Sequence, residues 1–169
     1  MIDQLWMHDR FAVRAPMSQH RSSTASLLLL MPIVLGPELP AEISALLAQR
    51  IEAHLTAYGL ATELPTSPHY TPDGYWRGPI WAPSTVLIED GLRRAGHIRL
   101  ANDISRRFRA LCEKSGFAEN FDAQTGAGLR DRAYTWTASS YLHLAAADHQ
   151  RRRQATDKTI IGDHVPVAS

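Results

Sequence analysis

Hydrophobic residues of this chain recur at spacings of three and four positions, which places them on one face of a helix. The clearest stripe consists of Ile43, Leu46, Leu47, Ile51 and Leu55. Pro40, before this stripe, suits the first turn of a helix, and Gly59, after it, is a common stop. The pattern predicts a helix that begins at about Pro40 and ends before Gly59.

An apolar run over residues 27–35 follows three hydroxyl-bearing residues at positions 22–24. Because serine and threonine cap helix N-termini, we expect a helix over about 24–35 that Pro32 bends and Gly36 ends. The run is shorter than the roughly 20 apolar residues that cross a bilayer, and no small-residue cleavage site of a signal peptide follows it. A buried helix is the better interpretation.

Two more helices are predicted between residues 83 and 115. Pro83 suits a first turn, and the apolar residues at 86–88 and at Leu92 leave this helix little polar face, so we expect it to be deeply buried. The next helix, over about 97–115, is amphipathic and is ended by Gly116. Its apolar stripe consists of Ile98, Ala101, Ile104, Phe108, Leu111 and Cys112.

The rest of the chain divides into a loop, one more helix and a tail. A loop is expected over 117–130, and Asp131 is suited to cap a last helix from about 132 to 147. No segment is typical of two strands joined by a hairpin turn, so the predicted fold class is all-α, with about five helices and long loops. We expect an irregular segment over 1–22, the helical domain over 23–147, and a polar, frayed tail over 148–169.

Composition removes several function classes. The chain is 44% hydrophobic and 21% charged with a net charge of +1, which is typical of a soluble globular protein and gives no reason to expect nucleic acid or a membrane as partner. The single cysteine, Cys112, excludes an internal disulfide and fits a helix core, so a cytoplasmic location is expected. The histidines show no metal-binding spacing, and we expect neither metal nor cofactor.

Candidate chemistry begins in the long loop over 59–81, which is rich in proline and glycine. It carries Tyr75, Trp76, Arg77, Gly78 and Trp81. Indole faces stack on the apolar face of a sugar ring, and an arginine fork binds neighbouring hydroxyls. A loop of this length in a compact domain is usually functional. The alternative is that the indoles are core residues and that Arg77 pairs with a structural carboxylate.

A second group of candidates follows the 97–115 helix. Glu119 lies in a loop beside aromatic residues and suits a general base that activates water, although it also fits a solvated acidic position. Asp122 is too near in the loop to act as the opposing acid, because an inverting mechanism needs carboxyl groups roughly 6.5–9.5 Å apart, and we expect it to hold the loop through backbone hydrogen bonds. Trp136 completes the set.

These segments together resemble the glycosidases built on a six-hairpin (α/α) toroid, which include trehalases, processing mannosyl-oligosaccharide glucosidases and mannosylglycerate hydrolases. The likeness lies in Tyr75-Trp76-Arg77-Gly78-Pro79-Ile80-Trp81, then in Glu119-Asn120-Phe121-Asp122, and then in Trp136-Thr137-Ala138, within about residues 20–146. The resemblance implies an inverting hydrolase of α-linked glucosides or mannosides, with Glu119 as general base. It also implies that Tyr75, Trp76, Arg77, Gly78, Trp81 and Trp136 bind the sugar.

Two features depart from that family pattern. Thr85 stands where an amide side chain is usual, and the Gly-Trp-Asp segment that bears the family's general acid is absent. Twelve helices with their connections need about 190–200 residues, so we expect only the C-terminal part of a toroid. Such a part would be inactive or weak alone and would associate with the missing part or with itself. The alternative is a non-catalytic helical module that binds sugars or proteins.

Overall fold

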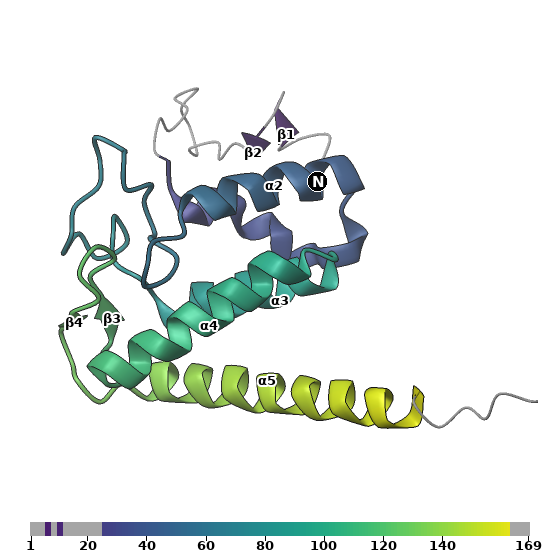
Figure 1. Ribbon diagram of the computed structural model, residues 1–169. Coiled ribbons are helices and arrows are strands. Elements are labelled where there is room, and N and C mark those ends of the chain that lie inside the picture. The colour runs from purple at the N-terminus through teal and green to yellow at the C-terminus, as the bar shows by residue number, and fades with distance from the viewer. Residues whose placement is uncertain (1–5, 8–9, 12–24, 163–169) are drawn as a thin grey trace, which may run out of the picture.

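The computed structural model describes residues 6–7, 10–11 and 25–162 (Figure 1). In this part of the chain the helices are η1 (Leu27–Glu38), α2 (Ala41–Ala53), α3 (Ala82–Arg94), α4 (Ile98–Ser115) and α5 (Thr135–Gly162). The strands form two antiparallel pairs, β1 (Trp6–Met7) with β2 (Arg10–Phe11) and β3 (Asn120–Phe121) with β4 (Gly128–Leu129). Helices dominate, which confirms the all-α class, although β3 and β4 are a strand pair that the sequence did not indicate.

Helix α3 is the central element of the fold. It packs against η1, α4 and α5, and η1 packs in turn against α2 (Figure 1). There are two apolar clusters among the described residues. One joins η1, α2, α3 and α4, and the other joins the start of α3, α4 and α5 to the loop before α3 and the loop after α4. Most of α3 is buried, as predicted, but Leu87 is 50% exposed. In α4 the predicted apolar stripe is buried except for Ile98.

The first predicted helix differs from the observed one in type and position. Element η1 is a 3-10 helix with Pro32 and Pro37 inside it, and its break lies at Gly36, whose φ of 57° and ψ of −122° are not helical. The ring of a proline inside a helix clashes with the carbonyl four residues earlier, so Pro32 and Pro37 disfavour a regular α-helix and the chain forms short 3-10 turns instead. Ser26 caps η1, accepting a bond from the N–H of Leu28. The predicted caps at 22–24 lie outside the described residues.

Two predicted helix boundaries were wrong. Leu55 was placed in the apolar stripe of the second helix, but α2 ends at Ala53, because the chain leaves the helix for a short antiparallel bridge between Leu55 and Leu60. The last helix begins at Thr135 rather than 132, because the Asp131 carboxylate accepts from the N–H of Ala133 in a turn ahead of the helix.

The predicted frayed tail is helical as far as residue 162. Asp148 on α5 lies 3.1 Å from the guanidinium of Arg109 on α4 and 2.9 Å from that of Arg152 on α5. The contact between Asp148 and Arg109 holds α5 against α4 at the start of the predicted tail. None of the described helices is both long enough and apolar enough to cross a membrane.

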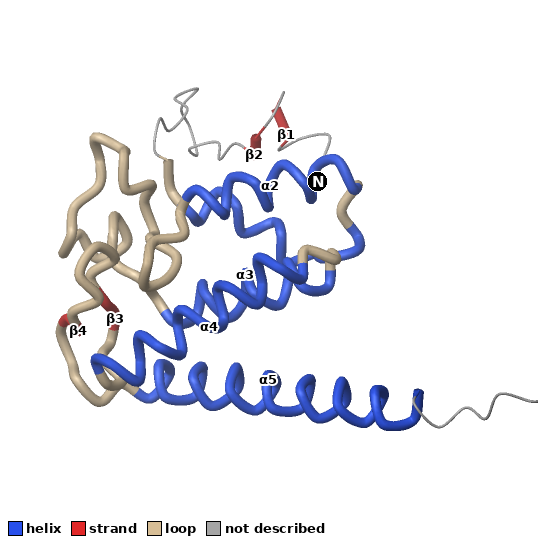
Figure 2. The backbone as a smooth tube through the Cα atoms, in the orientation of Figure 1, coloured by secondary structure: helices blue, strands red, loops and turns tan. Residues whose placement is uncertain are grey.

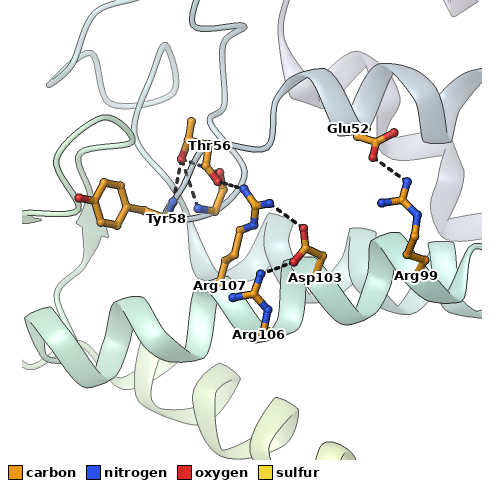
Figure 3. Close-up of polar contacts among 8 residues, drawn as sticks. Glu52, Thr56, Tyr58, Arg99, Asp103, Arg106 and Arg107 are labelled. Carbon is orange, nitrogen blue, oxygen red and sulfur yellow. Dashed lines mark hydrogen bonds and ion pairs between the residues drawn. The ribbon is translucent and has the colours of Figure 1, made fainter.

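A polar network fixes the chain where α2 gives way to the long loop (Figure 3). Arg107 on α4 donates to the carbonyl of Thr56 at 2.6 Å and pairs with Asp103 at 2.7 Å. Arg99 pairs with Glu52 of α2 at 2.7 Å. The beginning of the loop over 54–81 is therefore anchored to α4.

The long loops gather at one end of the helices, next to the first turn of α5 (Figure 2). Ile80 and Phe121 exchange backbone hydrogen bonds of 2.7 and 3.1 Å, so the loop that ends at α3 lies beside β3. Sequence candidates that are far apart in the chain are brought to this end.

Candidate active site

The loop over 71–81 is a tight turn closed by its own backbone. Thr71 donates to the carbonyl of Arg77 at 2.8 Å, and Arg77 donates to the carbonyl of Gly74 at 3.0 Å. A Cβ on Gly78 would lie 2.1 Å from the carbonyl oxygen of Thr71, so no larger residue fits without moving the backbone. Tyr75 at the tip has a φ of 58°, which is strained for a residue with a side chain.

The aromatic side chains of this turn form an ordered cluster with Trp136. Trp76 is stacked on Trp81 with ring centroids 4.4 Å apart and an interplanar angle of 11°. The rings of Tyr75 and Trp136 meet Trp81 edge-on at 4.8 and 5.5 Å. Edge-to-face and stacked pairs of this kind are stabilising. The cluster joins the long loop to the first turn of α5.

Exposure separates the members of this cluster. Trp81 is fully buried, and its indole Nε1 donates to the carbonyl of Tyr75 at 2.9 Å, so it supports the cluster from behind. Trp76 and Trp136 are half-buried, and Tyr75 is 45% exposed. Arg77 is exposed and Gly78 is buried. The accessible ring surface of the sequence candidates is therefore that of Tyr75, Trp76 and Trp136.

Glu119 lies beside Trp136 and is held through its backbone. Its N–H donates to the carbonyl of Asp131 at 2.7 Å, and its carbonyl accepts a long bond of 3.4 Å from the indole Nε1 of Trp136. The hydroxyl of Thr137 donates to the carbonyl of Ala118 at 2.7 Å. The first turn of α5 thus fixes the position of Glu119, whose side chain is half-buried.

Two nearby carboxylates are engaged in structural contacts. Asp122 accepts from the N–H groups of Gln124 and Thr125 at 2.7 and 3.0 Å, which confirms its predicted role of holding the loop. Asp73 pairs with Arg130 at 2.7 Å. Both carboxylates are therefore engaged in holding the loops of this region.

The structure also shows the contacts of three polar residues to which sequence reasoning assigned no role in the site: Thr85, Asn120 and Arg130. The hydroxyl of Thr85 donates to the carbonyl of Trp81 at 2.7 Å, so it is satisfied within α3. Arg130 and Asn120 were missed as site residues, and they are joined by a 3.1 Å hydrogen bond. Asn120 stands in the Glu-Asn-Phe-Asp segment, but no local pattern marks Arg130.

The other features that could indicate a functional site are separate from this cluster of residues or are unreactive. A groove of about 360 Å³ lies between α2 and the start of α4, among Gln49, His97 and Ile98, and includes none of the predicted site residues. Burial raises the pKa of Cys112 to about 12, which fits the predicted core role. No three His, Cys, Asp or Glu residues converge on a possible metal position within the described ranges.

This helical fold, with its loops gathered at one end, is the fold of the (α/α) toroid glycosidases. A GH63 mannosylglycerate hydrolase of Thermus thermophilus, solved with glucose, matches with a TM-score of 0.76 at 26% identity, over 85% of this chain and 34% of that one. The neutral trehalase Nth1 of Saccharomyces cerevisiae shares the fold, with a TM-score of 0.68 at 21% identity over 92% of this chain and 30% of that one.

The sequence narrows this class to one family. The family model of the mannosylglycerate hydrolase MGH1-like glycoside hydrolase domain matches residues 1–137, and the chain belongs to this family. It is similar to the mannosylglycerate hydrolase of a second Thermus thermophilus strain, at 36% identity over 101 residues, or 59% of this chain and 24% of that protein. The chain therefore spans about a quarter to a third of the length of these relatives.

Proposed function

We propose that this chain supplies the general base and the aromatic wall of an inverting glycoside hydrolase acting on α-linked glucosides or mannosides. The observation that carries the proposal is the contact between the Trp136 indole and the Glu119 carbonyl within the cluster of Trp76 and Trp81. Segments far apart in the sequence place a carboxylate-bearing residue at the edge of accessible indoles. Such a combination suits a sugar ring and a water molecule that attacks it.

In this proposal Glu119 takes a proton from water while the water oxygen attacks the anomeric carbon. The leaving group departs from the opposite face and needs a proton from a second carboxyl group roughly 6.5–9.5 Å away. Asp73 and Asp122 are engaged in an ion pair and a loop turn. We therefore propose that the general acid comes from a complementary part of the toroid. Without it, leaving-group protonation worth about 10²–10⁴-fold in rate is missing.

The substrate class follows from the site and from the relatives. Tyr75, Trp76 and Trp136 offer ring surface for one hexose, and the exposed guanidinium of Arg77 offers a fork for its hydroxyls. Relatives are named mannosylglycerate hydrolase, and one was solved with glucose. We propose α-hexosides of this kind as substrates. Arg77 would also suit an acidic aglycone such as glycerate.

Binding is tested on the chain itself by titrating its tryptophan fluorescence with glucose and mannose. A saturable change that Trp76→Ala removes supports the proposal, because Trp76 provides the partly accessible face of the stack. A distant exposed substitution, Glu38→Gln at the end of η1, is the matched control for handling and fold. If neither sugar changes the fluorescence, the indoles are structural and the protein-interaction alternative is favoured.

Catalysis is tested in a chimera in which residues 25–146 replace the matching segment of the Thermus relative. The chimera should hydrolyse α-mannosylglycerate with inversion, followed by NMR of the released hexose. Glu119→Gln should lower kcat by about 10²–10⁴-fold and leave sugar binding intact. Full activity of the Glu119→Gln chimera would refute the role of Glu119. Sugar binding with no turnover in any chimera would favour a non-catalytic carbohydrate-binding module.

A further inference from the structure

Arg130 contacts both loops that build the candidate active site. Its Nη2 lies 2.7 Å from the carboxylate of Asp73, and its guanidinium carbon lies 5.1 Å from the ring centre of Tyr75. Its Nη1 donates to the side-chain oxygen of Asn120 at 3.1 Å. Asp73 and Tyr75 belong to the tip of the aromatic turn, whereas Asn120 is next to Glu119 in the chain.

We propose that Arg130 is a positioning residue that sets the aromatic turn against the segment bearing Glu119. The contacts themselves are independent of the activity, but their consequence for sugar binding rests on the function proposed above. Arg130 would act through Tyr75 and Asn120 rather than by touching the reacting atoms. Its loss would let the turn move relative to Glu119, and the aromatic surface would no longer be held for a sugar.

The conformation of the backbone favours this role over a purely structural one. Tyr75 and Arg130 both have positive φ values, 58° and 60°, and the two side chains contact each other. A residue with a side chain is strained there and stays only where surrounding contacts hold it, which is common at functional sites. Asp73 is 67% exposed, and an exposed ion pair adds little to global stability. The contacts therefore place the turn more than they stabilise the fold.

The chemistry of the guanidinium suits a clamp. Its two terminal nitrogens bind different partners at once, Asp73 and Asn120, which the single ammonium of lysine does not reproduce. The bond to Asn120 also orients the amide, because its oxygen must face the donor. The Asn120 NH₂ group is buried and has no hydrogen-bond partner among the described residues. Without Arg130, both the oxygen and the NH₂ group of the buried Asn120 side chain would lack a hydrogen-bond partner among the described residues.

Hydrogen exchange followed by mass spectrometry tests the clamp on the full chain. The variants are Arg130→Gly, which also removes the backbone strain, and Arg130→Lys, which keeps the charge. The matched control is Arg132→Gly, an exposed arginine two positions on. In Arg130→Gly we expect about tenfold faster exchange in the peptide over 70–78, the factor that one cation–π contact and one exposed ion pair provide together. In Arg130→Lys we expect a smaller increase, because lysine keeps a charge for Asp73 and Tyr75 but cannot bind Asn120 through a second nitrogen at the same time.

The remaining readouts separate positioning from stability and from the proposed function. Exchange in α2–α4 should change much less than exchange over 70–78, and the thermal midpoint should fall by no more than the few degrees that one unpaired buried amide costs. The dissociation constants for glucose or mannose should rise about tenfold. Unchanged exchange over 70–78 in both variants would overturn the clamp, as would faster exchange throughout the chain. If the wild-type chain binds neither sugar while its turn still loosens in the variants, the proposed function fails and the clamp stands.

Discussion

Gly91 gives a prediction in which local helix preference and tertiary packing have opposite signs. It lies inside α3, where alanine is favoured over glycine by about 1 kcal/mol, so sequence alone predicts that Gly91→Ala stabilises the fold. In the structure, a Cβ at this position would lie 2.4 Å from the carbonyl oxygen of Ile33 and 2.9 Å from the Cα of Val34, both in η1. The atoms in the way are backbone, which cannot rotate aside.

Packing should exceed the helix preference. Forcing one extra carbon into a filled core costs about 1–3 kcal/mol, and a site where backbone must move belongs at the upper end. After subtraction of the gain in helix preference, Gly91→Ala should lower the free energy of unfolding by about 2 kcal/mol. For a chain of this size that corresponds to a midpoint about 4–8 °C lower.

Urea and thermal unfolding followed by circular dichroism at 222 nm measure this difference. Gly116→Ala is the contrasting variant, because Gly116 has a φ of 78° but nothing within 4 Å of its Cβ position. Its cost, about 1–3 kcal/mol, comes from backbone conformation alone, because a φ of 78° with a ψ of −164° lies in a region that is essentially restricted to glycine. A Gly91→Ala chain as stable as the wild type, or more stable, would show that η1 and α3 are not packed as described.

Three other perturbations have definite expected outcomes. Burial lowers the pKa of His54 despite its bond to the carbonyl of Ala61 and the charge of Glu63, so its contribution to stability is present above its unfolded pKa and is lost as pH falls below about 6.5. His54→Asn should weaken this acid dependence in urea titrations at pH 5 to 8. Cys112, with its raised pKa, should react with Ellman's reagent only after unfolding. Asp148→Asn should cost about 1–3 kcal/mol in urea unfolding, because it leaves the half-buried Arg109 without its partner.

Each of these predictions has a result that would contradict it. For His54, an unaltered acid limb in His54→Asn would contradict its assignment as the buried group. Fast labelling of Cys112 in the native chain would mean that α4 opens readily. For Asp148, the exposed Arg153→Ala should be neutral, and equal stability of Asp148→Asn would mean that α5 frays beyond residue 147.

The sequence predicted a helix well where its apolar stripe and its glycine stop signal indicate the same C-terminal end. Helix α4 was expected over 97–115 and runs over Ile98–Ser115, and Gly116 ends it with a positive φ. Local spacing determines which face of such a helix is apolar, and glycine determines where it stops. For the same reason α3 was found almost to the residue, whereas the end of α2 was misplaced because a bridge between Leu55 and Leu60 competed with the helix.

The candidate site was predictable in its residue types but not in its arrangement. The sequence motifs over 75–81 and 119–122 identified Trp76, Trp81 and Glu119 as candidates. The role of Asp122 was also predicted, because aspartates in loops commonly accept backbone hydrogen bonds. Which indole would be accessible depends on what packs behind it, and the structure buries Trp81 under Trp76. Arg130 carries no local signal, because its partners are in loops far from it in the chain.

By itself, then, the sequence determined the helical class, most of the helix faces and the family of sugar-cleaving enzymes to which the motifs point. Tertiary structure decided that α5 continues through residue 162 and that Arg130 joins the two site loops. The division has one physical reason. Spacing and stop signals act over a few residues of chain, whereas burial, ion pairs and ring contacts depend on which distant segments meet.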